Sequence, residues 1–108
     1  MMQKILFICS QNKLRSPTAE QIFSELPGLD VLSAGTNNDA VTPLSSELIK
    51  WADKIFVMEN MHRQKLQKRF RSSLNGKKII CLGIPDEYCY MDPELITILK
   101  KKVLPFLA

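Results

Sequence analysis

Four short apolar runs alternate with amphipathic stretches along the chain, and this alternation constrains the fold more than any other feature. The runs are rich in Ile, Val, Leu and Phe at successive positions, so both of their faces are apolar. Strands of that kind belong in a parallel sheet that is covered by helices on both sides. We therefore predict an α/β fold with four strands, at residues 4–9, 30–33, 54–58 and 77–82.

The chain length of 108 residues suffices for one core and excludes a two-domain enzyme, so we expect one domain over residues 1–108. Three cysteines without paired spacing argue against a secreted disulfide framework, and no apolar run is long enough for a signal peptide or a membrane span. We expect a cytoplasmic protein with no membrane partner. The net charge of +4 favours an anionic partner without identifying it.

Four helices are expected between and after the strands. Three of them should begin where a capping side chain precedes a proline, at Ser16-Pro17, Thr42-Pro43 and Asp92-Pro93. The helix over 60–71 has a basic polar face, which we expect to be solvated together with the run 100–102; attraction of acidic phosphoproteins is the alternative. His62 is expected on the surface of this helix. The last helix, over 93–103, should end before Pro105.

Parallel strands with right-handed crossovers place all strand-to-helix loops at one edge of the sheet, where open α/β folds bind ligands. A site is therefore expected in the loops after Cys9, Ser33, Met58 and Leu82.

The first of these loops carries a cysteine at the end of a strand and an arginine six residues later, at the mouth of a helix. Such a loop can turn successive N–H groups inward and bind a phosphate at the positive end of the helix. That field favours the thiolate of Cys9, Arg15 can hold two phosphate oxygens, and Ser16 can donate its hydroxyl to the sulfur. Asn12 tolerates the positive φ that the turn needs. The predicted phosphate-binding residues are Ser10, Gln11, Asn12, Lys13, Leu14, Arg15 and Ser16.

This segment resembles the phosphate-binding loop of the low-molecular-weight protein tyrosine phosphatases, and further motifs of that family follow in order. The matching residues are Cys9, Asn12, Arg15, Ser16, Pro17, Ala19 and Glu20, then the segments 33–36, 52–58 and 84–88. The resemblance implies a flavodoxin-like or Rossmann-like sheet of strand order 2-1-3-4. It also implies that Ser33 supports the loop asparagine.

The family's mechanism, as the resemblance implies it, begins with attack of Cys9 on phosphorus, while the loop amides and Arg15 stabilise the transferring phosphoryl group. An aspartate then protonates the leaving oxygen and activates water, and neither metal nor cofactor is needed. Asp86 follows the fourth strand and is our preferred acid. Asp92 is the alternative, because the family's acid is usually followed by proline and Asp92 precedes Pro93. We prefer Asp86 because Asp92-Pro93 is sufficiently explained as the start of a helix. Tyr88 and Tyr90 would flank the substrate.

The sequence departs from the family pattern at three places. Gln11 replaces a usual glycine, Leu14 replaces a second cysteine found in many members, and the segment between Thr36 and Trp51 is shortened. The last two changes remove a protective thiol and part of the wall around the substrate. Of the two other cysteines, Cys81 is expected in the core. Cys89 is expected as a bystander, with a role as resolving thiol as the alternative.

We therefore expect a cysteine-dependent phosphomonoester hydrolase, a protein tyrosine phosphatase, whose substrate is a phosphorylated protein or a small phosphomonoester rather than nucleic acid. A phosphocarrier resembling the IIB component of sugar phosphotransferase systems is the first alternative. It does not call for Arg15 or for an aspartate after the fourth strand. An arsenate reductase-like enzyme would need a cysteine pair near Met58, and a phosphate-binding module without turnover is the last alternative. The sequence does not indicate the oligomeric state.

Overall fold

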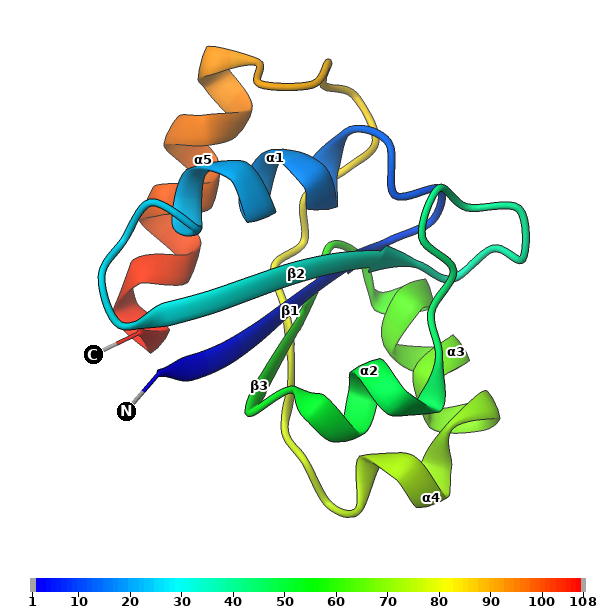
Figure 1. Ribbon diagram of the computed structural model, residues 1–108. Helices are drawn as coiled ribbons and strands as arrows, with labels where there is room; N and C mark the ends of the chain where they lie inside the picture. The colour runs from blue at the N-terminus through cyan, green and yellow to red at the C-terminus, as the bar shows by residue number, and fades with distance from the viewer. Residues whose placement is uncertain (1, 108) are drawn as a thin grey trace.

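The computed structural model describes residues 2–107, which form a four-stranded parallel sheet between two layers of helices (Figure 1). The strands are β1 (Gln3–Cys9), β2 (Leu29–Gly35), β3 (Lys54–Val57) and β4 (Ile79–Cys81). The helices are α1 (Arg15–Phe23), α2 (Ser46–Trp51), α3 (Asn60–Arg69), α4 (Arg71–Leu74) and α5 (Pro93–Val103), followed by a short 3-10 helix at Leu104–Phe106. The strand order is β2-β1-β3-β4, which confirms the predicted fold class and order.

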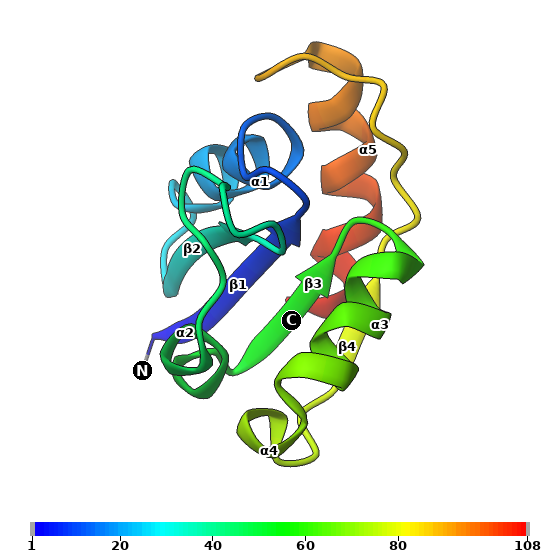
Figure 2. The same ribbon diagram turned by 90° about the vertical axis from the view of Figure 1, so that its right-hand side faces the viewer.

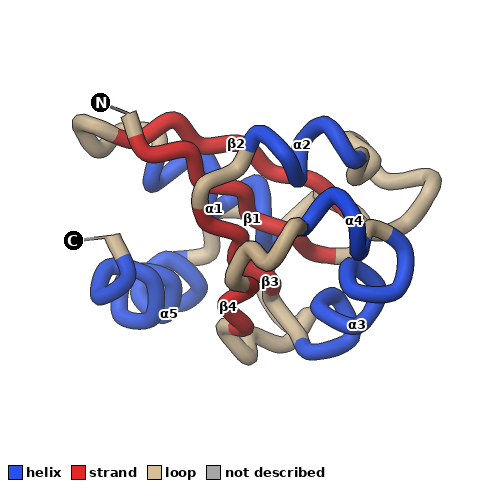
Figure 3. The backbone as a smooth tube through the Cα atoms, turned by 90° about the horizontal axis from the view of Figure 1, so that it is seen from below, coloured by secondary structure: helices blue, strands red, loops and turns tan. Residues whose placement is uncertain are grey.

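The two faces of the sheet bury separate cores because successive side chains of a strand point to opposite sides. Ile5 and Phe7 of β1 pack under α1 and α5, whereas Leu6 and Ile8 pack on the side of α2, α3 and α4. Figure 3 shows these two helix layers on either side of the strands. Phe7 stacks with Phe23 of α1 and with Phe56 of β3, at ring centroid distances of 5.5 and 5.2 Å.

Two of the three predicted helix entries are wrong. Helix α1 begins at Arg15, and Ser16 lies inside its first turn with its hydroxyl turned toward Cys9 rather than capping the helix. Thr42-Pro43 does not begin a helix. It lies beside β2, where the carbonyl oxygen of Thr42 accepts from the N–H of Gly35. Helix α2 begins at Ser46, and Ser45 is its cap. The third entry is confirmed, since the Asp92 carboxylate caps α5.

The helix predicted over 60–71 is divided in two. Phe70 leaves helical geometry with φ −128° and ψ 29°, and it packs partly buried in the core under α2 and α4. The chain then makes the single turn α4 and leaves it through Asn75, whose φ of 45° is left-handed. Figure 2 shows α3 descending along β3 and β4 to α4. Within residues 2–107 no helix combines the length and the apolarity that crossing a membrane requires.

Candidate active site

A small pocket opens at the carboxyl edge of the sheet, where β1 ends and α1 begins. Its volume is about 170 Å³. The residues that line it are Cys9, Ser10, Gln11, Lys13, Leu14, Arg15 and Asp86. The remaining two residues of the predicted phosphate loop, Asn12 and Ser16, lie buried beneath it at 4% and 0% exposure. The first loop and the loop after β4 therefore meet at one pocket, at the edge where the sequence predicts a site.

The thiol of Cys9, a buried residue that lines this pocket, has two hydrogen-bonding groups beside it. The N–H of Asn12 donates to Sγ at 3.2 Å, and the Ser16 hydroxyl lies 3.0 Å from it. The Ser16 oxygen already accepts from the Asn12 side-chain amide at 2.9 Å, so its proton goes either to the sulfur at 3.0 Å or to the Ala34 carbonyl at 3.5 Å. Both groups stabilise negative charge on sulfur, which suits a nucleophile that must also leave.

Asn12 fixes the shape of the loop. Its φ of 57° is the left-handed conformation that the sequence predicts for it. Its Nδ2 donates to Ser16 and to Ser33 of β2, each at 2.9 Å, and its Oδ1 accepts from the N–H of Thr42 at 3.1 Å. Ser33 in turn donates to Glu20 at 2.6 Å. One asparagine side chain thus ties the loop to α1, to β2 and to the segment after β2.

Gly35 lets the end of β2 approach the loop closely. A β-carbon at this position would lie 2.5 Å from the carbonyl oxygen of Ser10 and 2.6 Å from the Cβ of Ala40. The segment after β2 then closes over the loop through its backbone, since Asn37 donates to the Ser10 carbonyl and Val41 to that of Gln11, each at 3.0 Å. Any side chain at position 35 would push these layers apart.

The guanidinium of Arg15 is buried at 2% exposure and held by three oxygen atoms. Its Nη1 donates to the Glu59 carboxylate at 2.5 Å and to the carbonyl of Ile84 at 2.8 Å, and its Nε lies 3.7 Å from Asp86 Oδ1. A guanidinium fixed in this way presents its remaining donors with little loss of freedom. These donors belong to a residue that lines the same pocket as Cys9.

His62 is fully buried, and the expectation that it lies on the surface is wrong. It forms a reciprocal cap at the start of α3: the Glu59 N–H donates to His62 Nδ1 at 3.0 Å, and the Glu59 carboxylate accepts from the His62 N–H. Burial, together with the nearby Arg15 cation, lowers the pKa of His62 to about 4. The neutral ring therefore carries its proton on Nε2, which lies 2.9 Å from the hydroxyl of Ser10.

The two aspartates considered as the acid lie in different surroundings. Asp86 borders the pocket and its side chain is 65% exposed, so it can reach a bound ester. Asp92 accepts from the N–H of Glu94 at 3.0 Å and caps α5, as the sequence predicts.

The two tyrosines predicted to flank the substrate lie after Asp86 and do not line the described pocket. Tyr88 packs partly buried against the core under α1 and α5, whereas Tyr90 is 49% exposed. Partial burial and the surrounding carboxylates, first that of Glu94, raise the pKa of the Tyr88 phenol. Their role as a substrate wall stays a prediction.

Residues 4–50 match the family model described as low molecular weight phosphotyrosine protein phosphatase. This stretch holds all but the first residue of β1, the whole phosphate loop, α1, β2 and all but the last residue of α2. The resemblance to the low-molecular-weight protein tyrosine phosphatases is confirmed.

Solved structures extend the likeness to the fold of the whole chain. The tyrosine phosphatase Wzb from Escherichia coli K30 has a TM-score of 0.78 and 23% identity, with 98% of this chain and 96% of that chain covered. The YwlE arginine phosphatase from Geobacillus stearothermophilus has a TM-score of 0.76 and 23% identity, covering 96% and 92%. SP-PTP, a low molecular weight protein tyrosine phosphatase from Streptococcus pyogenes, has a TM-score of 0.80 and 19% identity, covering 98% and 91%. No curated protein matches the sequence.

Two of the positions at which the sequence differs from the family pattern lie at the pocket. Gln11 and Leu14 both line it, and Leu14 is 38% exposed. Of the other two cysteines, Cys81 is only half-buried in β4, on the sheet face opposite Cys9, and Cys89 is exposed.

Sequence reasoning missed two residues that the phosphatase-like site uses, Glu59 and His62. A usable signal was present, because Glu59 follows Met58 in one of the four loops expected to carry the site. A carboxylate at that edge is the natural partner of a buried arginine. His62 then follows from the capping pattern, in which the third helical residue reaches back to the cap.

Proposed function

We propose that this chain is a cysteine-dependent phosphomonoester hydrolase, a protein tyrosine phosphatase working through a phosphocysteine on Cys9. One observation carries this proposal: the Cys9 thiol, the Arg15 guanidinium and the Asp86 carboxyl border the same pocket. A nucleophile, an anion-binding fork and a proton donor are the three parts that phosphoryl transfer through sulfur requires. The matched family model and the tyrosine phosphatases among the structural relatives support the same reaction.

In the first step the Cys9 thiolate attacks phosphorus from below, so that an S–P bond forms while the P–O bond to the leaving group breaks. Arg15 neutralises charge on two of the non-bridging oxygens. Asp86 gives its proton to the departing oxygen. The Ser16 hydroxyl, 3.0 Å from the sulfur, holds the thiolate in place before the attack.

In the second step Asp86 accepts a proton from water, whose oxygen forms a new bond to phosphorus as the S–P bond breaks. Inorganic phosphate leaves, and the Asn12 N–H and the Ser16 hydroxyl stabilise the returning thiolate. Arg15 and Asp86 beside the cysteine favour a hydrolase over a phosphocarrier. A phosphocarrier does not need a carboxylate that takes a proton from water.

The assignment of the acid is tested by comparing Asp86→Ala with Asp92→Ala in a p-nitrophenyl phosphate assay. We expect Asp86→Ala to lower kcat by about 10² to 10⁴, because the leaving oxygen loses its proton donor. Asp92→Ala should keep kcat and lose about 1 kcal/mol of stability, because it removes only a helix cap. The reverse pattern, with kcat lost in Asp92→Ala and kept in Asp86→Ala, would assign the acid to Asp92.

The Ser10 hydroxyl supplies a further donor to the phosphoryl group. Because its oxygen accepts from Nε2–H of the neutral His62, its own proton is free to point into the pocket that Ser10 lines. His62 acts through Ser10 and does not touch the substrate, so it is a positioning residue.

A double-mutant cycle tests whether His62 acts on catalysis through Ser10 or only stabilises the fold. We expect Ser10→Ala to lower kcat/KM for p-nitrophenyl phosphate by about 10-fold, and Ser10→Thr to restore most of it. Adding His62→Gln to Ser10→Ala should cost little more activity, because the two side chains act as one unit. Independent losses that multiply in the double variant would show that His62 does not act through Ser10.

We propose further that the substrate is a phosphorylated protein, that residues 1–108 are one phosphatase-like domain and that it acts in the cytoplasm. The basic charge of the chain supports an acidic protein substrate. Its odd number of cysteines supports a reducing compartment.

A further inference from the structure

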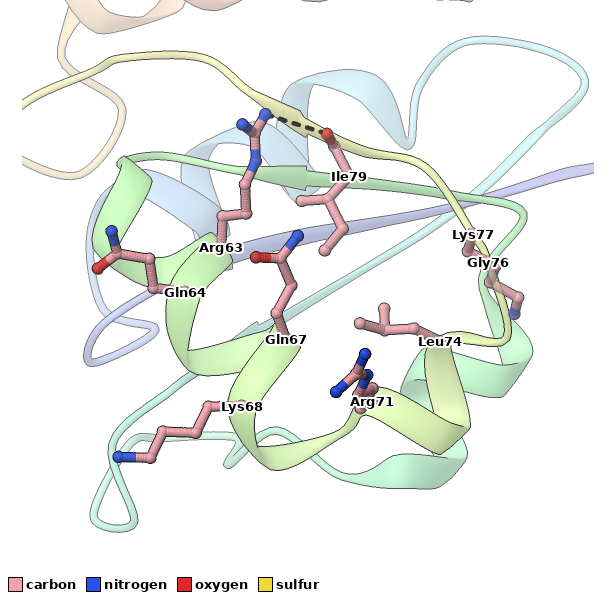
Figure 4. Close-up of a pocket in the computed structure, with 9 residues that line it drawn as sticks. All are labelled: Arg63, Gln64, Gln67, Lys68, Arg71, Leu74, Gly76, Lys77 and Ile79. Atoms are coloured by element: carbon pink, nitrogen blue, oxygen red, sulfur yellow. Dashed lines mark hydrogen bonds between the residues drawn. The ribbon is translucent and has the colours of Figure 1, made fainter.

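A second and larger hollow, of about 820 Å³, lies between α3, α4 and the start of β4 (Figure 4). Four of the residues lining it are basic, Arg63, Lys68, Arg71 and Lys77, and none is acidic. Both ion pairs formed within residues 2–107 belong to Arg15, so the four cations have no acidic partner in the described part of the chain. The hollow therefore carries an uncompensated positive charge that attracts an anionic partner.

Two of these cations are held in place by backbone oxygens. Arg63 Nη2 donates to the carbonyl of Ile79 at 3.2 Å, the contact drawn as a dashed line in Figure 4. Lys77 Nζ donates to two main-chain carbonyls of α2, at 2.7 and 2.6 Å. Arg63, which its contact with Ile79 already orders, loses little conformational entropy when an anion binds to it. The Lys77 ammonium is directed toward α2 and adds to the positive charge of the hollow without facing its centre.

The interior of the hollow combines charge with groups suited to a polypeptide. In Figure 4 the side chains of Gln67, Arg71 and Leu74 point toward its centre, whereas Lys68 extends away at its rim. Arg71 can pair with a carboxylate through two N–H groups, and the amide of Gln67 can pair with a peptide backbone as donor and as acceptor. Leu74 offers apolar contact for the alkyl part of an acidic side chain.

The position of the hollow connects it to the pocket at Cys9 through α3. Glu59, at the start of this helix, contacts Arg15, and the hollow begins one turn further along, at Arg63. With a rise of about 1.5 Å per residue, Lys68 lies about 13 Å along the helix from Glu59. An extended peptide advances about 3.3 Å per residue, so about four residues cover this length, and a docked segment begins about four residues from the phosphorylated one.

The small size of the reaction pocket makes such a second contact useful. Its volume of about 170 Å³ is about one fifth of the hollow's 820 Å³, and it holds little more than a phosphoryl group with part of its side chain. Selection among phosphoproteins must then come from contacts outside it.

We propose that the basic hollow docks an acidic segment of the protein substrate, which begins about four residues from the phosphorylated residue. This inference rests on the proposed phosphatase function, whose substrate class it specifies. No aromatic side chain lines the hollow, so it lacks the rings on which nucleic-acid bases stack. An acidic polypeptide can be bound by cations and side-chain amides alone, and the hollow has both. We therefore assign an acidic polypeptide as its occupant.

The test compares two charge-matched double variants, Lys68→Glu/Arg71→Glu in the hollow and Lys100→Glu/Lys101→Glu on α5. All four side chains are exposed, and neither pair touches the pocket at Cys9. Two phosphotyrosine peptides are used, one with four glutamates at positions four to seven from the phosphotyrosine and one with glutamines there. In wild type we expect kcat/KM to be about 10-fold higher for the glutamate peptide at low salt, with the preference fading at high salt.

The hollow variant should lose this preference while its turnover of p-nitrophenyl phosphate stays at the wild-type level, and the α5 variant should keep it. Equal loss in both variants would overturn the proposal, because only net charge would then matter. Binding is measured separately by fluorescence anisotropy of a labelled, unphosphorylated hexaglutamate peptide, which requires no catalysis. An absence of turnover in wild type therefore refutes the proposed function alone. Tighter binding of a single-stranded DNA oligonucleotide that depends on the same residues would overturn the choice of occupant.

Discussion

Replacing Cys9 by serine should abolish turnover, with kcat for p-nitrophenyl phosphate falling by about 10⁴ or more. A serine hydroxyl is not ionised at neutral pH, and the hydrogen bonds from Asn12 and Ser16 serve a sulfur that carries charge. In wild type, acid quenching during turnover should trap an enzyme that is heavier by one phosphoryl group, detected by intact mass spectrometry and mapped to Cys9. The variant should show no trapped species on sulfur.

Cys89→Ser is the matched control, because this thiol is exposed and does not line the pocket. It should keep both turnover and the trapped phosphoenzyme. Turnover that survives in Cys9→Ser, or a phosphoryl group mapped to another residue, would refute the proposed mechanism.

Arg15→Lys should lower kcat/KM by about 10³ even though the positive charge is retained. Lysine offers one point charge in place of a planar fork, so it cannot bind Glu59 and two phosphoryl oxygens together. We expect the loss in kcat to exceed the change in KM, because the guanidinium stabilises negative charge that develops on the phosphoryl oxygens in the transition state. Inhibition by vanadate, a stand-in for the transferring phosphoryl group, should weaken in parallel.

Arg63→Lys provides the corresponding arginine-to-lysine control outside the pocket. Arg63 donates to one backbone carbonyl, a contact that lysine can also make, and p-nitrophenyl phosphate turnover should not change. If Arg15→Lys keeps wild-type kcat/KM, Arg15 serves the fold through Glu59 and Ile84 and does not bind the phosphoryl group.

The parts of the fold that could be predicted are those that depend on local pattern. Apolar runs without alternation indicate strands of a parallel sheet, and the structure has all four in the expected order. The two edge strands, β2 and β4, are less buried than β1 and β3. The cap at Asp92 also follows from neighbouring residues alone. Cys9 and Arg15 could be placed at one pocket because the end of a strand and the start of the next helix are joined by five residues.

The errors arise where a side chain or backbone group is bound by a partner that its immediate neighbours do not indicate. Ser16 reads as a cap, but the sulfur of Cys9 and the amide of Asn12 engage its hydroxyl. Thr42 reads as a helix entry, but its N–H binds Asn12, thirty positions away. His62 sits among polar residues and reads as exposed, yet Ser10 and Glu59 satisfy both ring nitrogens and allow its complete burial. Such pairings depend on which segments the fold brings together.

Gly35 supplies a criterion for finding relatives of this chain by sequence. A cysteine and an arginine six residues apart occur by chance in many proteins, and the pair by itself does not identify this loop. The second strand, however, can lie under the loop only where its last residue has no β-carbon, given that Ser10 O and Ala40 Cβ would be 2.5 and 2.6 Å away. A search that requires glycine at the end of the following strand, two residues after a serine, should therefore separate true loops from coincidental ones.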